Sequence, residues 1–140
     1  MNQCYNPTYP NETKQKATLG VITNAKNLVN YVMQVTQKSP KFYRFSLVAE
    51  LHEHAIFVLK NVIRANETFV APGDESALAR RQAFQQEAMV ELKLLGSFAE
   101  IALDQKCVMP KHYETISSLA YECMNMLGAW GKSDRKRFSK

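Results

Sequence analysis

The sequence predicts an all-α protein, folded as an antiparallel, up-down-up-down four-helix bundle. Apolar residues recur at spacings of three and four in four long segments, as on one face of a helix. No segment alternates with period two, and no Asn-Gly or Asp-Gly hairpin signal is present. The connections between segments are short, which favours antiparallel neighbours. A chain of 140 residues has room for one core.

The first predicted helix spans residues 13–38 and follows an extended segment, residues 1–12, which contains two prolines. Ser39-Pro40 ends this helix, because proline cannot continue the hydrogen-bond ladder. The second helix spans residues 44–69. Its apolar stripe includes His52 and Asn66, which predicts that both face the core or a subunit contact, whereas His54 is predicted to be exposed.

The third helix is predicted over residues 77–106, with Asp74 or Ser76 as its N-cap. Leu94, Phe98 and Ile101 widen its apolar face, and acidic residues dominate the other side. The fourth helix begins near Pro110 and ends at Gly131, a natural stop. The predicted organisation is therefore an N-terminal segment, a bundle over residues 13–131 and a basic tail over residues 132–140.

Basic residues are distributed unevenly along the chain, whose net charge is +5. Residues 1–40 and 108–140 each carry +3, residues 41–73 carry +1, and residues 74–107 carry −2. Clustered Lys and Arg side chains are what a polyanion-binding surface needs, although a solvated surface explains a moderate charge equally well. The candidate nucleic-acid-binding residues are Lys41, Arg44, Lys60, Arg64, Arg80, Arg81, Lys132, Arg135, Lys136 and Arg137.

The residues that could carry catalysis or bind a metal do not form a recognised pattern. Di-iron bundles need Glu-x-x-His on two helices, and none of the three histidines has a Glu three residues before it. Glu87/Glu91 and Glu100/Asp104 each share a helix face, where a solvated position is expected. Cys123 lies on an apolar stripe and is expected to act as a small hydrophobe. With no Gly-rich phosphate loop either, we expect no enzyme, no cofactor and no metal.

The location of the protein is predicted from what the sequence lacks. The three cysteines are widely spaced, and no apolar run approaches the roughly 20 residues of a membrane span. The polar N-terminus resembles no signal peptide, so a cytoplasmic protein without a membrane partner is expected.

Two glycines inside predicted helices, Gly96 and Gly128, each cost up to about 1 kcal/mol of helix stability relative to alanine. Such positions are expected where two helices approach closely, either within the bundle or at a subunit contact.

Three sequence pieces together resemble a known family. They are Pro40-Lys41-Phe42-Tyr43-Arg44-Phe45, Ala65-Asn66-Glu67, and Met126-Leu127-Gly128-Ala129-Trp130 followed by Lys132 and Arg135-Lys136-Arg137. Over roughly residues 13–138 the chain resembles the accessory variability determinant (Avd) proteins of diversity-generating retroelements. More distantly, it is similar to the four-helix-bundle proteins encoded in intervening sequences of ribosomal RNA genes.

The resemblance implies a non-catalytic, bacterial or phage-encoded protein that forms a homopentamer. It also implies partners, namely a reverse transcriptase, its template RNA and the cDNA or RNA–DNA hybrid, in error-prone copying of that RNA. Carried over to this chain, the nucleic-acid element is Lys132, Arg135, Lys136 and Arg137, with Lys41 and Arg44 in the corresponding basic loop. The Tyr/Pro-rich N-terminus and the acidic third helix depart from the family pattern.

Two functional hypotheses follow. The first is an oligomeric nucleic-acid-binding accessory protein of a retroelement reverse transcriptase. The alternative is a structural or protein-interaction bundle that binds no nucleic acid, which the acidic third helix favours.

Overall fold

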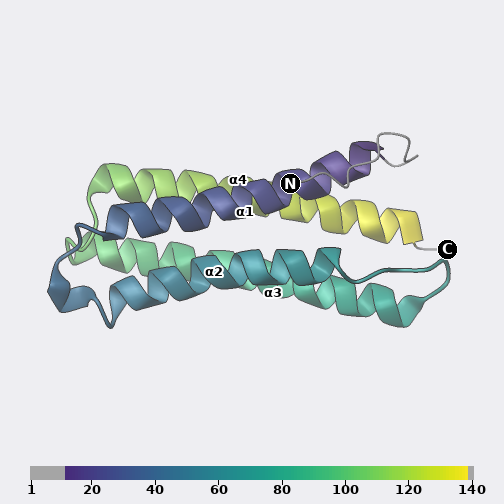
Figure 1. Ribbon diagram of the computed structural model, residues 1–140, viewed down its shortest axis with the longest axis horizontal. Coiled ribbons are helices and arrows are strands. Elements are labelled where there is room, and N and C mark those ends of the chain that lie inside the picture. Colours follow the sequence, from purple (N-terminus) through teal and green to yellow (C-terminus); the bar gives the residue numbers. More distant parts are fainter. Residues whose placement is uncertain (1–11, 139–140) are drawn as a thin grey trace, which may run out of the picture.

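The computed structural model describes residues 12–138 and shows four long helices and no strand among them, which confirms the all-α prediction (Figure 1). The helices are α1 (Glu12–Thr36), α2 (Leu47–Asn66), α3 (Glu75–Asp104) and α4 (Pro110–Phe138). A short 3-10 helix, η1 (Lys41–Tyr43), lies between α1 and α2. The N-terminal segment predicted over residues 1–12 lies almost wholly outside the described residues, as do the last two residues of the predicted tail.

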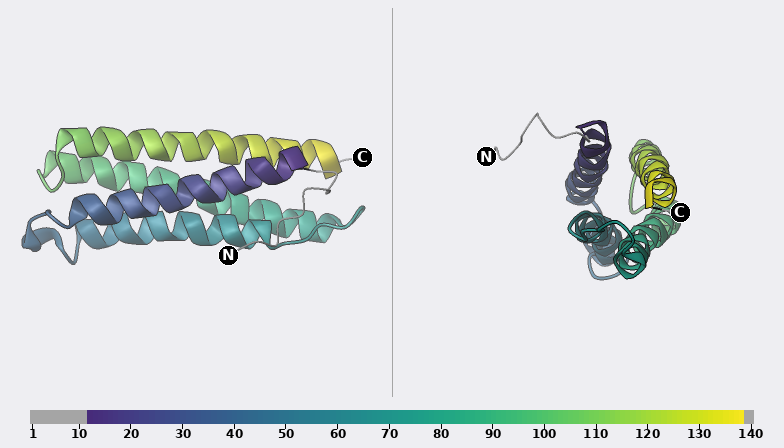
Figure 2. Two further views of the ribbon diagram at one scale, coloured as in Figure 1. Left: turned by 45° about the horizontal axis from the view of Figure 1, so that its top comes forward. Right: turned by 90° about the vertical axis from the view of Figure 1, so that its right-hand side faces the viewer.

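The four helices lie side by side around one core (Figure 2). Helix α1 packs against α2 and α4, and α3 packs against the same two helices, so that each helix has two neighbours and one diagonal partner. The α1–α2 and α3–α4 connections lie at one end of the molecule, and the α2–α3 connection lies at the other (Figure 1). Residues distant in sequence therefore meet at each end.

Apolar side chains from all four helices fill the core. Burial of such side chains contributes roughly 1.5–3 kcal/mol each, which is the main stabilisation of the fold. The largest fully buried apolar side chains are Val21, Leu28, Val32, Leu51, Val58, Val62, Leu92, Leu95 and Ile116.

The start of α3 agrees with the predicted N-cap. Asp74 precedes the helix, and its carboxylate accepts a hydrogen bond from the Ala77 backbone N–H at 3.0 Å. This contact satisfies one of the amide groups that a helix start leaves without a partner.

The end of α4 differs from the prediction. Gly131 is buried and does not end the helix, which continues to Phe138. Trp130 and Asp134 lie on the core side of α4 on either side of Gly131, so the packing of this stretch against α3 keeps it helical. The basic residues predicted in a tail therefore occupy the last two turns of α4.

On α2 the prediction that His54 is exposed was wrong, and Asn66 lies outside the core, so that only its predicted subunit contact stays a prediction. Asn66 is exposed, whereas Asn61 is buried and donates a side-chain hydrogen bond to the Phe57 carbonyl at 3.0 Å. His54, predicted to be exposed, is buried. The buried positions in this part of the helix are 51, 54, 55, 58, 61, 62 and 65, so the core-facing stripe reaches Ala65 and leaves Asn66 outside.

The outer face of α3 also differs from its prediction. Val90, Leu94 and Ile101 are exposed on the side of α3 that points away from the core, so Leu94 and Ile101 do not widen the buried face. Phe98, in contrast, packs against the core. The buried positions 88, 92, 95, 99 and 102 lie on the opposite side of the helix, as the 3.6-residue period requires. The outer face is therefore partly apolar rather than dominated by acids.

Candidate nucleic-acid interface

The last two turns of α4 present a basic surface, which we call the α4 basic turn: Lys132, Arg135, Lys136 and Arg137. All four residues are exposed. The acidic residue among them, Asp134, is only 2% exposed and faces the core. Since Asp134 is turned inward, the net charge exposed at the surface of this segment is more positive than the net charge of its sequence. Positive residues at the C-terminal end of a helix also interact favourably with the helix dipole.

Asp134 is held in place by α3. Its Oδ2 accepts a hydrogen bond from Gln85 Nε2 at 2.8 Å, and its Oδ1 accepts one from Arg81 Nη2 at 3.2 Å. Arg81 Nε lies 2.9 Å from Oδ2, which completes the ion pair, although its proton is not directed at that oxygen. The Arg81 guanidinium also lies over the Trp130 ring, 5.2 Å from its centroid. The charge of Arg81, a predicted nucleic-acid-binding residue, is therefore neutralised by Asp134 within the protein.

The other predicted residues near this end are exposed. Arg80 donates a hydrogen bond to Ser76 Oγ at 3.1 Å, one turn earlier on α3. Lys60 and Arg64 lie on α2, which is diagonal to α4, and the Lys60 ammonium lies over the Phe57 ring of its own helix. The end of α2, where Arg64 lies, and the start of α3, where Arg80 lies, are at the same end of the molecule as the end of α4 (Figure 1).

Lys41 and Arg44 lie at the opposite end of the molecule, in the α1–α2 connection (Figure 1). A helix as long as α4 spans about 43 Å at ~1.5 Å per residue, so these two residues and the α4 basic turn form two separate sites. The α3–α4 connection lies beside them, and two further basic residues that the sequence analysis did not single out are Lys106 in this connection and Lys111 in the first turn of α4. Lys38, which precedes Lys41, was also missed. The signal that could have found them is the absence of acidic residues from both connections.

A partly buried polar cluster joins α2 to α3. His54 Nδ1 lies 2.6 Å from Glu91 Oε1, and His54 Nε2 lies 3.0 Å from Glu50 Oε1. The imidazole also stacks on Phe98, with ring centroids 5.4 Å apart. Carboxylate oxygens only accept hydrogen bonds, so both contacts are hydrogen bonds when the imidazole carries two protons. Glu91, predicted on a solvated face, is therefore a packing residue, whereas Glu87, Glu100 and Asp104 are exposed as predicted.

Two further titratable groups bear on the chemistry of the fold. Burial lowers the pKa of His52, whose Nε2 lies 2.8 Å from Thr36 Oγ1. Burial, with a smaller effect of the neighbouring Glu122, raises the pKa of Cys123 to about 11. A thiol in this state is a poor nucleophile, and Cys123 packs in the core as predicted. Within residues 12–138, no group of three His, Cys, Asp or Glu side chains could hold a metal ion.

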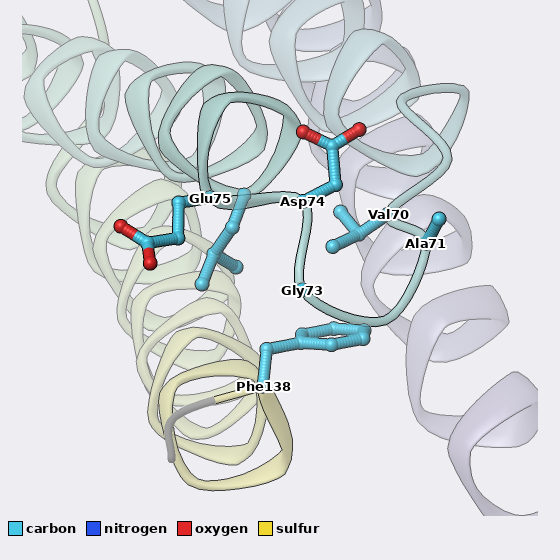
Figure 3. Close-up of a pocket in the computed structure, with 7 residues that line it drawn as sticks. Val70, Ala71, Gly73, Asp74, Glu75 and Phe138 are labelled. Atoms are coloured by element: carbon cyan, nitrogen blue, oxygen red, sulfur yellow. The ribbon is translucent and has the colours of Figure 1, made fainter.

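A small cavity of about 250 Å³ lies where the end of α4 meets the α2–α3 connection. Figure 3 shows the Phe138 ring beneath the loop at Gly73, with the carboxylates of Asp74 and Glu75 pointing away from the ring. Val70, Ala71 and Leu78 complete the lining. The last residue of α4 and the α2–α3 connection therefore face the same cavity.

No family model matches the chain, and no curated protein matches it. Among the described residues, no helix is both long and apolar enough to cross a membrane.

Proposed function

We propose that this protein is a non-catalytic nucleic-acid-binding accessory protein. One observation carries the proposal. The α4 basic turn exposes four basic side chains, while the only acid in the same segment is buried and paired with Arg81. Basic side chains without an acid beside them at the surface are what binding to phosphates needs.

The proposed mechanism is electrostatic. Lys and Arg side chains that neutralise phosphates release the counterions condensed on a nucleic acid, so binding weakens steeply as salt rises. Contacts to phosphates carry no sequence information, which suits a protein that must follow a changing template. Because Trp130 and Asp134 anchor the segment to α3, the basic side chains project from a rigid helix rather than from a frayed end.

The resemblance described above supports the finer part of the proposal. The partner would be a retroelement reverse transcriptase, and the ligands its template RNA and the cDNA or hybrid made from it. The chain would adopt an up-down-up-down topology, assemble into a homopentamer and act in the cytoplasm of a bacterium. The positions of the connections and the exposed apolar residues on α3 are compatible with this proposal.

Fluorescence anisotropy of labelled RNA and of an RNA–DNA hybrid tests the proposal. The wild type should bind both, with an affinity that falls by orders of magnitude between about 50 and 200 mM salt. Lys132→Glu/Lys136→Glu should weaken binding and make the salt dependence shallower. The matched control is Lys26→Glu/Lys93→Glu, which makes the same charge change at exposed positions elsewhere on the bundle. If both double variants lost RNA affinity equally, the loss would reflect net charge alone, and the α4 basic turn would be rejected as the site.

A second candidate function, a protein-interaction scaffold, is favoured by a different observation. Val90, Leu94 and Ile101 form an exposed apolar stripe along the outer face of α3. Exposed apolar stripes on helices commonly mark protein contacts. Leu94→Gln/Ile101→Gln, which leaves the net charge unchanged, should then abolish self-association or capture of the polymerase while leaving RNA affinity unchanged. Glu91 is unsuitable for such a test because its substitution would disturb His54.

A further inference from the structure

The α1–α2 connection exposes two aromatic rings to solvent. Phe42 is 85% exposed and Phe45 is 89% exposed, although neither ring contributes to the core. Phenylalanine is normally buried, and single exposed residues are common, but two nearly bare rings within four residues are unusual. The only other phenylalanine exposed to this degree among the described residues is Phe69, at the opposite end of the molecule.

Hydrogen bonds hold this connection in place. Ser39 Oγ donates to the Cys107 carbonyl at 2.8 Å, and Tyr43 Oη donates to the Gln105 carbonyl at 3.2 Å. Both acceptors belong to the α3–α4 connection, so the two connections form one structural unit. The Phe42 ring also meets the Tyr43 ring edge-on, with centroids 5.1 Å apart. The exposed rings are therefore presented on a fixed backbone.

The same unit is strongly basic. Residues 37–46 and 104–111 together contain five basic residues and one acidic residue, Asp104. Lys38, Lys41, Arg44, Lys106 and Lys111 are all exposed, and none forms an ion pair with another described residue. We call this end of the molecule, with Phe42 and Phe45, the basic aromatic tip.

Lys106 adds a backbone observation. Its φ is +62°, a left-handed conformation that glycine adopts freely and that lysine adopts at a cost of about 1 kcal/mol. It occupies the position just after α3 where glycine commonly ends a helix. The chain therefore carries a cation at a site where helix termination alone favours glycine.

We propose that the basic aromatic tip binds unpaired nucleotides, with bases stacked on Phe42 and Phe45 and phosphates on the surrounding Lys and Arg side chains. Proteins that bind single strands without sequence preference combine these two elements, a basic surface and exposed aromatic faces. The inference rests on the proposed function, since it adds a second site for the same class of ligand. A duplex keeps its bases stacked inside, so we expect the tip to bind single strands in preference to duplexes. The α4 basic turn contacts phosphates, which both carry, so it should not distinguish them.

The order of residues favours a nucleic acid over a lipid surface. Cations and rings are interleaved in this segment, where Lys41 precedes Phe42 and Tyr43, and Arg44 precedes Phe45. A segment that inserts into a membrane keeps its charges behind an apolar apex, at the level of the lipid headgroups. Here Arg44 lies between Phe42 and Phe45 in the sequence, so insertion of both rings would draw its charge toward the lipid.

The test compares a labelled single-stranded oligouridylate with an RNA duplex of the same length, at constant salt. Phe42→Ala/Phe45→Ala should weaken single-strand binding by at least about tenfold, since stacking of each base contributes measurably, and should leave duplex affinity within about twofold. Both rings are almost fully exposed, so the fold tolerates their removal. The matched control is Phe69→Ala, which should change neither affinity. An oligonucleotide containing 2-aminopurine should lose its stacking-dependent change in fluorescence in the double variant.

The cations of the tip are tested separately. Lys41→Gln/Arg44→Gln should make the salt slope for the single strand shallower by about 1.4, as expected when two phosphate contacts are lost. If Phe42→Ala/Phe45→Ala binds the oligouridylate like the wild type, while Lys132→Glu/Lys136→Glu does not, the proposed function stands and the tip is rejected. If the wild type binds neither RNA, both proposals fail. If the phenylalanine variant instead loses binding to phosphatidylserine vesicles with its RNA affinity unchanged, a lipid surface replaces the single strand.

Discussion

The carboxylate of Asp134 on α4 and the guanidinium of Arg81 on α3 form an ion pair that also fixes which charges the protein shows to solvent. Asp134 is the more deeply buried of the two side chains. Without this pair, the inward turn of Asp134 would leave an uncompensated charge in a largely dry site, and the end of α4 would lose its anchor.

Asp134→Ala should lower the free energy of unfolding by about 2–3 kcal/mol, because it leaves Arg81 and Gln85 without their acceptor. Urea denaturation measures the loss. Arg81→Met/Asp134→Leu should lose less than Asp134→Ala alone, since no charge is then left unpaired. Arg80→Met, at an exposed neighbouring position, should stay within about 0.5 kcal/mol of the wild type. Additive losses from Arg81→Met and Asp134→Leu would contradict a coupled pair.

His52 should contribute a decline in folding stability as pH falls through the ordinary histidine pKa. Burial lowers the pKa of His52 below 6.5 in the folded state. The unfolded chain therefore takes up this proton first as pH falls, and protonation favours unfolding; above pH 6.5 both states are neutral at this site and the effect vanishes. Urea denaturation at a series of pH values between about 8 and 5 should show a smaller decline for His52→Gln than for the wild type. An identical pH dependence in the two proteins would exclude His52 as a contributor.

The Cys123 thiol should resist alkylation in the folded protein. With a pKa of about 11, only about one molecule in a thousand carries the thiolate at pH 8, and burial blocks access to it. Peptide mapping after treatment with iodoacetamide should show Cys123 unmodified in buffer and fully modified in urea. Rapid modification in buffer would mean that α4 opens locally at this position.

Gly96→Ala and Gly128→Ala distinguish a helix packed within one chain from a subunit contact. A Cβ atom at either position would have no other atom within 4 Å, apart from its own helix backbone and chain neighbours. Each substitution should therefore raise the stability of the monomer by about 0.5–1 kcal/mol, because alanine favours a helix over glycine. Sedimentation of both variants should show weaker self-association if the glycines lie at the subunit contact that the proposed oligomer requires. If either substitution instead lowered the stability of the monomer, the glycine would be required for close packing inside the bundle.

The sequence by itself determined the helices, because their signals are local. Periodic apolar residues, the Asp74 cap and the Ser39-Pro40 stop predicted all four segments to within a few residues of the observed bounds, except at the end of α4. Exposure of Lys132, Arg135, Lys136 and Arg137 also agrees with the prediction from charge alone, because long charged side chains seldom lie in a core.

Only the tertiary structure decided how polar residues are used. Asp134 turns inward because Arg81 and Gln85, about fifty residues earlier in the sequence, lie opposite it on α3 and bind its carboxylate. No local sequence pattern encodes this contact. His54 is buried for the same reason, since Glu91 on α3 completes its hydrogen bonds. The basic aromatic tip likewise exists only after folding, when two connections more than fifty residues apart are tied together through Ser39 and Tyr43. Helix periodicity is a property of neighbours along the chain, whereas charge pairing and surface patches are properties of neighbours in space.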